Sequence, residues 1–471
     1  MTAPVSGVKA LPRTMTNCSN DPAHEVEREQ FSSRIGFIIA AAGCAVGVGN
    51  IWSFPIQTAE NGGAAFTLVY LCFSFILAYP TLVAELNIGR YRQSNNISAM
   101  ASLSKLPALR LLGAGTAVAG LLTMTLIYSF YSIVGGWFIG FSIAPVASLA
   151  GMTGVSQWLS GFTTSSSIVV TLLFMTLTTL IVTEGVKDGI ERWCNRLMPS
   201  LFVLLAVLIA FALTRPGGME GLRVYLLPDF SRILDHKLLI SALGQSFFSM
   251  SLGTGCMMVY GSYLSRKANL PKTALQVTLV DSSVAFLAGM LIIPCMYAAT
   301  HQGVEIFNAQ GHLYSADKLV FNVLPTLFDQ LGMVGQLVAA AFFLLLTIAA
   351  LTSSISMMEP VIAAMVERLS LVRQRACWLL SLVSAAISSV IIVHIDTLLG
   401  LAVTFATQYM QPLLCLMIAI YGSWVIRQDR LLSELSQGYP ELESSLFWKI
   451  WPWYTRLVCP GLILLLLIQN L

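Results

Sequence analysis

The sequence predicts an all-α polytopic membrane protein with about eleven transmembrane helices. Hydrophobic residues make up 56% of its 471 residues and charged residues only 10%, whereas an average soluble domain is about 25% charged. Charge-free runs recur along the chain, and many approach the roughly 20 residues that a helix needs to cross a bilayer. Two of these runs are interrupted by glycines, which predicts broken helices within the membrane.

Eleven runs, most of them bounded by Lys or Arg, are predicted to span the membrane. They cover residues 34–58, 64–88, 111–144, 165–183, 193–214, 238–264, 273–300, 332–358, 376–394, 397–425 and 451–470. The last of them contains Arg456 and Pro460.

The spans divide the chain into six predicted segments. These are a cytoplasmic amino-terminal tail (1–31), a first five-helix repeat (32–214), an extracellular loop (215–237), a second five-helix repeat (238–425), a cytoplasmic loop (426–450) and the eleventh transmembrane helix (451–471).

Basic residues indicate the orientation, because short cytoplasmic loops are enriched in Lys and Arg. Alternate connections after the second, fourth, sixth, eighth and tenth spans contain such residues, whereas those at 59–63, 145–164 and 395–396 contain none. The amino terminus is therefore predicted to be cytoplasmic and the carboxyl terminus extracellular or periplasmic. The 215–237 loop, which also contains basic residues, departs from this pattern. The net charge of +3 follows from this arrangement and does not indicate nucleic-acid binding.

The two interrupted runs have matching places in the two repeats. The first reads "GCAVGVGNIWSFP" from Gly43 to Pro55, and the second reads "GQSFFSMSLGTGCMMVYGSY" from Gly244 to Tyr263. Close helix packing would explain one such run alone. Two runs at equivalent positions instead indicate a transporter binding site, because broken helices expose amide hydrogens to a carboxylate and free carbonyls to cations.

Five motifs resemble the neurotransmitter:sodium symporters, especially the bacterial amino-acid transporters of the leucine-transporter fold. In chain order they are "SRIGFIIAAAGCAVGVGNIWSFP", "ENGGAAF", "YPTLVAELNIGRY", "GQSFFSMSLG" and "TSSISMMEP". The resemblance begins near Arg28 and ends with the tenth helix. It implies a 5+5 inverted repeat with broken helices 1 and 6, and sodium-coupled symport by alternating access.

The resemblance also implies two sodium sites built from oxygen atoms, which suit a hard cation. The first would use the Ala45 carbonyl, the side chains of Asn50 and Ser249, and Asp281 from the seventh helix. The second would use the carbonyls of Gly43, Val46 and Ala349 and the hydroxyls of Thr352 and Ser353. Residues three and four positions after Ala349 share its helix face, which supports the second set independently.

For the substrate, the resemblance implies a carboxylate held by the amides of Val48 and Gly49 and the phenol of Tyr131. The carbonyls of Ala45, Phe248 and Ser249 would hold the ammonium group. The side-chain pocket would comprise Ile127, Phe248, Ser251, Thr254, Ser353 and Met357, a lining that favours a neutral, hydrophobic amino acid. Monoamine-transporting members have an aspartate where this chain has Gly47, so glycine here favours a substrate with its own carboxylate. Leucine-type members have a phenylalanine in place of Thr254.

Asp281 is the only charged residue between Thr273 and Thr300, and intramembrane charges are usually functional. In the resemblance it replaces an asparagine, and Ala285 stands where chloride-dependent relatives have a serine. We hypothesise that Asp281 supplies the negative charge that chloride supplies in those relatives, so that chloride is not required. The alternative is a carboxylate that is satisfied by neighbouring hydroxyls such as Ser282.

The resemblance implies gates on both sides of the membrane. Arg28 and Glu367 match a cytoplasmic ion pair, Gly189 and Pro199 bracket a segment that unwinds to hydrate the second sodium site, and Glu85 braces the sixth helix. Ser53 and Leu399 replace the family's outer arginine and aspartate together. The outer gate is then expected to close with Tyr131, Phe248 and a polar bridge near Gln408 or Gln411.

No nucleophile with a base and no phosphate-binding loop occurs in the sequence, so an enzyme is not expected. The nine cysteines have no metal-site or disulfide spacing, and no cofactor is expected beyond Na⁺ as coupling ion. The expected partners are a neutral amino acid, Na⁺ and the lipid bilayer of the cell (inner) membrane, without nucleic acid. Transport of another zwitterion, such as an osmolyte, and a channel are the alternatives, and the oligomeric state is left open.

Overall fold

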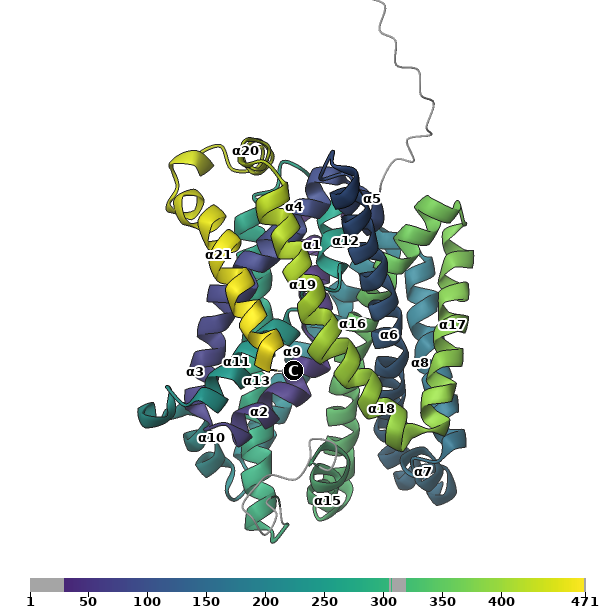
Figure 1. The fold of residues 1–471 in the computed structure, drawn as a ribbon. Coiled ribbons are helices and arrows are strands. Elements are labelled where there is room, and N and C mark those ends of the chain that lie inside the picture. Colours follow the sequence, from purple (N-terminus) through teal and green to yellow (C-terminus); the bar gives the residue numbers. More distant parts are fainter. Residues whose placement is uncertain (1–28, 305, 307–318, 470–471) are drawn as a thin grey trace, which may run out of the picture.

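The computed structural model describes residues 29–304, 306 and 319–469 as a bundle of helices, without a β-strand among them (Figure 1). Nine continuous helical spans in these residues are long and apolar enough to cross a membrane. They are Ala64–Arg92 (α3, η2 and α4), Pro107–Leu149 (α6), Thr164–Thr183 (α8), Val186–Leu213 (η3 and α9), Leu270–His301 (α13), Gly332–Leu369 (α16), Arg373–Val393 (α17), Ile395–Val425 (α18, η6, α19 and η7) and Leu446–Gln469 (α21).

Two further spans are interrupted, as predicted. The first consists of α1 (Arg34–Ala45), η1 (Gly49–Ser53) and α2 (Phe54–Glu60), with a bend of 57° at the break. The other consists of α11 (His236–Ser249) and α12 (Cys256–Ser262). Between these two helices, Gly253 and Gly255 have φ angles of +82° and +80°, which glycine adopts without steric cost. The nine continuous spans and the first broken span account for ten of the eleven spans predicted from the sequence. α11 and α12 lie where the sixth span was predicted.

Short elements cap the two ends of the bundle. α5 (Asn96–Ala101) and α20 (Gln428–Ser436) lie at one end, and α7 (Thr153–Ser160), α10 (Gly218–Leu226) and α15 (Leu324–Asp329) lie at the other (Figure 1). The predicted 215–237 loop is therefore partly helical. The end with α5 and α20 carries connections that are rich in basic residues, in agreement with the alternation in the sequence.

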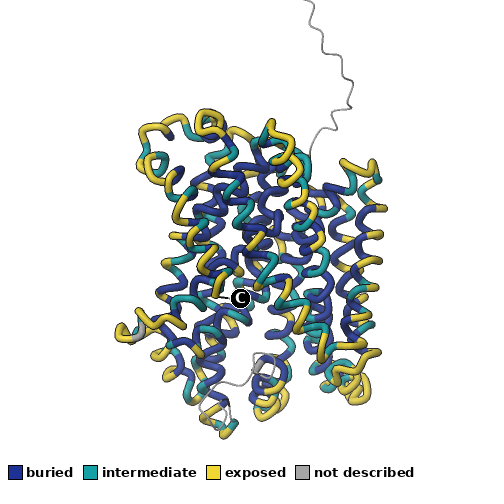
Figure 2. Tube along the Cα trace, viewed as in Figure 1, coloured by how far each residue is buried: buried dark blue, intermediate teal, exposed yellow. Residues whose placement is uncertain are grey.

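Burial follows the pattern of a protein in lipid. The interior is buried, while exposed residues mark the ends and the outer faces of the helices (Figure 2). Large apolar side chains such as Leu122, Val203 and Leu382 are exposed on the outside, where lipid tails would cover them. α16 packs along α6, and these two helices form much of the frame around the two breaks.

Candidate functional site

A cavity lies where the two broken helices meet. All twelve residues predicted to bind substrate line it, namely Ala45, Gly47, Val48, Gly49, Ile127, Tyr131, Phe248, Ser249, Ser251, Thr254, Ser353 and Met357. Six further residues, which were not predicted to belong to the pocket, also line it: Cys44, Met124, Phe130, Cys256, Thr407 and Gln411. Met124 could have been found, because it precedes Ile127 by three residues and shares its helix face.

One corner of the cavity brings amide hydrogens and a phenol together. The backbone amide of Val48 donates a hydrogen bond to the Tyr131 hydroxyl oxygen at 3.1 Å. A Cβ atom added to Gly47 would lie 2.6 Å from Ser353 Oγ and 2.7 Å from the Tyr131 hydroxyl. A side chain at position 47 would therefore displace one of these two hydroxyls, and the Val48 amide and the Tyr131 phenol lie side by side where a negative group can accept hydrogen bonds from both.

Next to this corner, Asp281 accepts hydrogen bonds from two neutral side chains. Asn50 Nδ2 donates to Asp281 Oδ1 at 2.8 Å, and Ser249 Oγ donates to Oδ2 at 2.9 Å. The Tyr70 hydroxyl donates in turn to Ser249 Oγ at 3.0 Å. Asp281 is 0% exposed, and none of the salt bridges in the described part of the chain includes it.

This arrangement fits the first predicted sodium site. A buried carboxylate without a cationic partner is costly, and a monovalent cation among these oxygens would neutralise it. The serine next to Asp281 does not satisfy it, because Ser282 Oγ has no hydrogen-bond partner among the described residues. The neighbouring hydroxyl that satisfies Asp281 is that of Ser249, so a structurally satisfied carboxylate stays the alternative to an ion ligand.

The oxygens of the second predicted sodium site also lie together. Ser353 Oγ donates to the carbonyl of Val46 at 2.9 Å and to that of Gly43 at 3.3 Å. Thr352 Oγ1 donates to the carbonyl of Ala349 at 3.0 Å. The break after α1 thus faces the hydroxyls of α16, and the donor set is neutral and made of oxygen, as a Na⁺ site requires.

Glu85 on α4 (Tyr79–Arg92) contacts the interruption of the sixth span. It accepts hydrogen bonds from the amides of Gly253 and Gly255 at 3.2 Å and 3.1 Å, and it is 0% exposed. These amides would otherwise lack partners, since the backbone there is not helical. The contacts agree with the bracing role expected for this glutamate.

The predicted cytoplasmic gate is only partly described. Arg28 lies outside the described residues. Glu367 on α16 accepts hydrogen bonds from Asn95, at 2.9 Å from its amide nitrogen and 2.8 Å from Nδ2. Gly189 and Pro199 lie within the continuous helical span of η3 and α9, so unwinding between them stays a prediction.

On the opposite side of the cavity, Ser53 has a partner that was not predicted. Ser53 Oγ donates to Gln245 Oε1 at 3.0 Å, and Gln245 Nε2 donates to the Gly49 carbonyl at 2.9 Å. Position 53 is thereby connected to α11 rather than to the tenth span, where Leu399 is half-buried within α18 (Ile395–Val403). Phe248, expected in this gate, is 37% exposed and lines the cavity.

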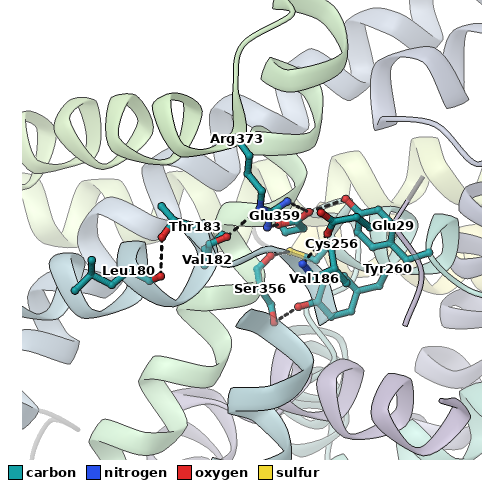
Figure 3. A network of polar contacts seen from close by, with 11 residues as sticks. Glu29, Leu180, Val182, Thr183, Val186, Cys256, Tyr260, Ser356, Glu359 and Arg373 are labelled. Carbon is teal, nitrogen blue, oxygen red and sulfur yellow. Dashed lines mark hydrogen bonds and ion pairs between the residues drawn. The ribbon is translucent and has the colours of Figure 1, made fainter. Parts of the chain in front are cut away.

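A buried ion pair joins four helices near the end of the bundle that bears α5. Arg373 donates to both carboxylate oxygens of Glu359, at 3.0 Å and 2.6 Å, and its Nε donates to the carbonyl of Val182 (Figure 3). The Tyr263 hydroxyl donates to Glu359 Oε1 at 2.6 Å. Glu359 thus connects α16 with the start of α17 and the end of α12. No sequence motif predicted this pair.

Replacing Arg373 with glutamine is expected to destabilise the protein by about 3–5 kcal/mol, because it leaves Glu359 buried without its cation. Arg427→Gln is the matched control, since its ion pair with Asp429 is 74% and 79% exposed and such pairs contribute about 0–1 kcal/mol. Thermal denaturation of both purified variants in detergent measures the difference. Equal midpoints for the two variants would contradict the role of the Arg373 pair.

Comparison with known proteins identifies relatives that align with this chain over nearly its whole length. A family model described as "Sodium:neurotransmitter symporter family" matches residues 28–153 and 151–471. The uncharacterized sodium-dependent transporter YhdH of Bacillus subtilis is 32% identical over 457 residues, which cover 93% of this chain and 97% of the relative. An uncharacterized sodium-dependent transporter of Haemophilus influenzae is 32% identical over 463 residues, with coverage of 94% and 98%.

A solved structure has the same fold. The crystal structure of MhsT in complex with L-phenylalanine aligns with a TM-score of 0.79 at 32% identity. The alignment covers 94% of this chain and 100% of that chain.

Proposed function

Since this chain belongs to the sodium:neurotransmitter symporter family, we propose that it imports a neutral, hydrophobic amino acid together with Na⁺ by alternating access. Membership makes the chain a sodium-dependent transporter in a multi-pass membrane fold, and not an enzyme. The observation that supports an amino acid most directly is the corner at Gly47. There, the Val48 amide and the Tyr131 phenol, which bond to each other, can turn to a carboxylate, and Gly47 places no acidic side chain in its position.

The ion sites support coupling between Na⁺ and substrate. The break after α1 supplies groups to all three proposed sites: the Gly43 and Val46 carbonyls to one ion, Asn50 to the other, and the Val48 amide to the substrate. Ions bound at these places would hold the broken helix in the shape that binds a carboxylate. One positive charge that moves inward across 100 mV releases about 2.3 kcal/mol, which can drive accumulation.

The remaining wall of the cavity supports a neutral side chain. Ile127, Phe248 and Met357 provide apolar surface, and Ser251 and Thr254 provide hydroxyls but no charge. We place the protein in the cell (inner) membrane with a cytoplasmic amino terminus and a periplasmic or extracellular carboxyl terminus. The basic connections near α5 and α20 support this orientation.

Uptake by the purified protein in proteoliposomes tests the proposal. Radiolabelled neutral amino acids are offered under an inward Na⁺ gradient, with K⁺ in place of Na⁺ as the control. We expect at least one hydrophobic amino acid to accumulate, and only with Na⁺. Uptake that ignores Na⁺, or accumulation of an osmolyte such as betaine without any amino acid, would contradict the proposed function.

Chloride is expected to be dispensable, because Asp281 already places a negative charge at the first ion site. Replacing chloride with gluconate on both sides of the membrane should leave the initial rate of Na⁺-driven uptake unchanged. The same exchange with Na⁺ replaced by K⁺ measures the background. A strict requirement for chloride would show that Asp281 does not supply this charge.

A further inference from the structure

The tenth span places the side-chain amide of a glutamine at the central cavity. No described residue forms a hydrogen bond with this amide. Gln411, the first residue of α19 (Gln411–Ile420), lines the cavity and is 3% exposed. Its side chain forms no hydrogen bond with any residue that the structure describes. Its carbonyl packs against the interruption of the sixth span, since a Cβ added to Gly253 would lie 2.5 Å from it. Gln411 is therefore held in place by its backbone, while its amide remains available.

A second, smaller cavity continues the first along the contact between α6 and α19. Thr254 lines both cavities. On α6, Met124 lines the first and Gly120 the second, and on α19, Gln411 lines the first and Leu414 the second. Residues three or four positions apart share one helix face. The two cavities thus follow each other on these helices, and only the small Thr254 side chain is common to both.

The second cavity contains a buried hydrogen-bond acceptor without a donor. Asn96, at the start of α5, is 3% exposed and lines this cavity. Its Nδ2 atom donates to the Gly255 carbonyl at 3.0 Å, whereas its Oδ1 atom is buried and has no partner among the described residues. Buried polar atoms in native proteins bind a protein group, a ligand or an ordered water. Asn96 Oδ1 is thus a place for a donor that enters from the cavity.

We propose that Gln411, Thr254 and Asn96 form a subsite for an uncharged carboxamide side chain, so that the transporter takes up L-glutamine in preference to L-methionine. The inference rests on the proposed function and extends its substrate class from apolar to amide side chains. A carboxamide has two donors and an acceptor, which match the donors and acceptor of Gln411 and the free acceptor of Asn96. Methionine has the same length and lacks these groups.

A negative side chain does not fit this subsite. The free atom of Asn96 is an acceptor and would repel a carboxylate, and Glu85 lies on the neighbouring Gly253 and Gly255 amides. L-Glutamate is therefore expected to be rejected, although it is nearly the same size as L-glutamine. Buried polar groups left unpaired by the wrong substrate discriminate strongly.

Uptake of radiolabelled L-glutamine and L-methionine into proteoliposomes under an inward Na⁺ gradient tests the proposal. The readout is the ratio of their kcat/KM values. For the unaltered protein we expect a ratio of about ten or more in favour of glutamine, the size of a few net hydrogen bonds, and no uptake of L-glutamate. Gln411→Met should bring the ratio close to one. Gln428→Met is the matched control, because Gln428 on α20 is exposed and does not line either cavity. Its ratio should stay at the unaltered value.

The outcomes separate this inference from the proposed function. If methionine is taken up as well as glutamine by the unaltered protein, the inference is overturned while the proposed function stands, and this comparison needs no variant to fold. A ratio that is unchanged in a transporting Gln411→Met variant also overturns the assignment. If no amino acid accumulates under a Na⁺ gradient, both the proposed function and the inference fail.

Discussion

Replacing Asp281 with alanine is expected to reduce Na⁺-driven uptake by about a hundredfold or more. The change removes the one negative charge of the proposed first ion site and leaves the donors of Asn50 and Ser249 without their acceptor. Hydrogen bonds to charged groups contribute about 1.5–3 kcal/mol each, and each 1.4 kcal/mol corresponds to about tenfold in an equilibrium constant. The initial rate of uptake in proteoliposomes, measured over a series of Na⁺ concentrations, gives the effect.

Asp281→Asn separates charge from shape at the same position. The amide keeps the size of the side chain and can still accept a hydrogen bond, but it cannot neutralise a cation. We expect the Na⁺ concentration for half-maximal uptake to rise about tenfold, in line with one lost charge-assisted contact. Size-exclusion elution as a single peak shows that both variants are folded. An unaltered Na⁺ dependence in Asp281→Asn would exclude this carboxylate from the ion site.

The fold and the family could be predicted because both depend on local patterns. Spans are visible as charge-free runs, since a charge within lipid is costly. The two broken helices are visible as clusters of glycine, which the backbone at Gly253 and Gly255 requires. Membership of the sodium:neurotransmitter symporter family, first indicated by five motifs, is confirmed by the family match along the chain.

Contacts between distant helices could not be predicted in the same way. Ser53 was recognised as a departure from the family, but its bond to Gln245 joins residues that are 192 positions apart. Glu359 and Arg373 are closer in sequence, yet they lie on different helices with a turn between them. Gln411 was named for the outer gate, and its place in the wall of the central cavity was not predicted. In each case the partner depends on how helices pack, for which a single sequence has no local signal.

Gly47→Ala is expected to lower uptake by a hundredfold or more, because the methyl group would meet two walls of the cavity at once. The added Cβ would lie 2.6 Å from Ser353 Oγ on α16 and 2.7 Å from the Tyr131 hydroxyl on α6. Neither side chain can move freely. Ser353 also donates a hydrogen bond to the Val46 carbonyl, and the Tyr131 hydroxyl accepts a hydrogen bond from the Val48 amide. Overpacking in a filled site costs about 1–3 kcal/mol, and here it displaces groups proposed to bind the substrate carboxylate and one ion.

The matched control for this change is Gly115→Ala on α6, where an added Cβ meets no atom within 4 Å. Alanine is favoured over glycine in a helix by about 1 kcal/mol, so this variant should transport like the unaltered protein and be no less stable. Initial uptake rates and thermal midpoints of both variants are compared in the same preparation. If Gly47→Ala transported as well as Gly115→Ala, the close approach of Tyr131 and Ser353 would not define the substrate site, and the carboxylate would have to bind elsewhere in the cavity.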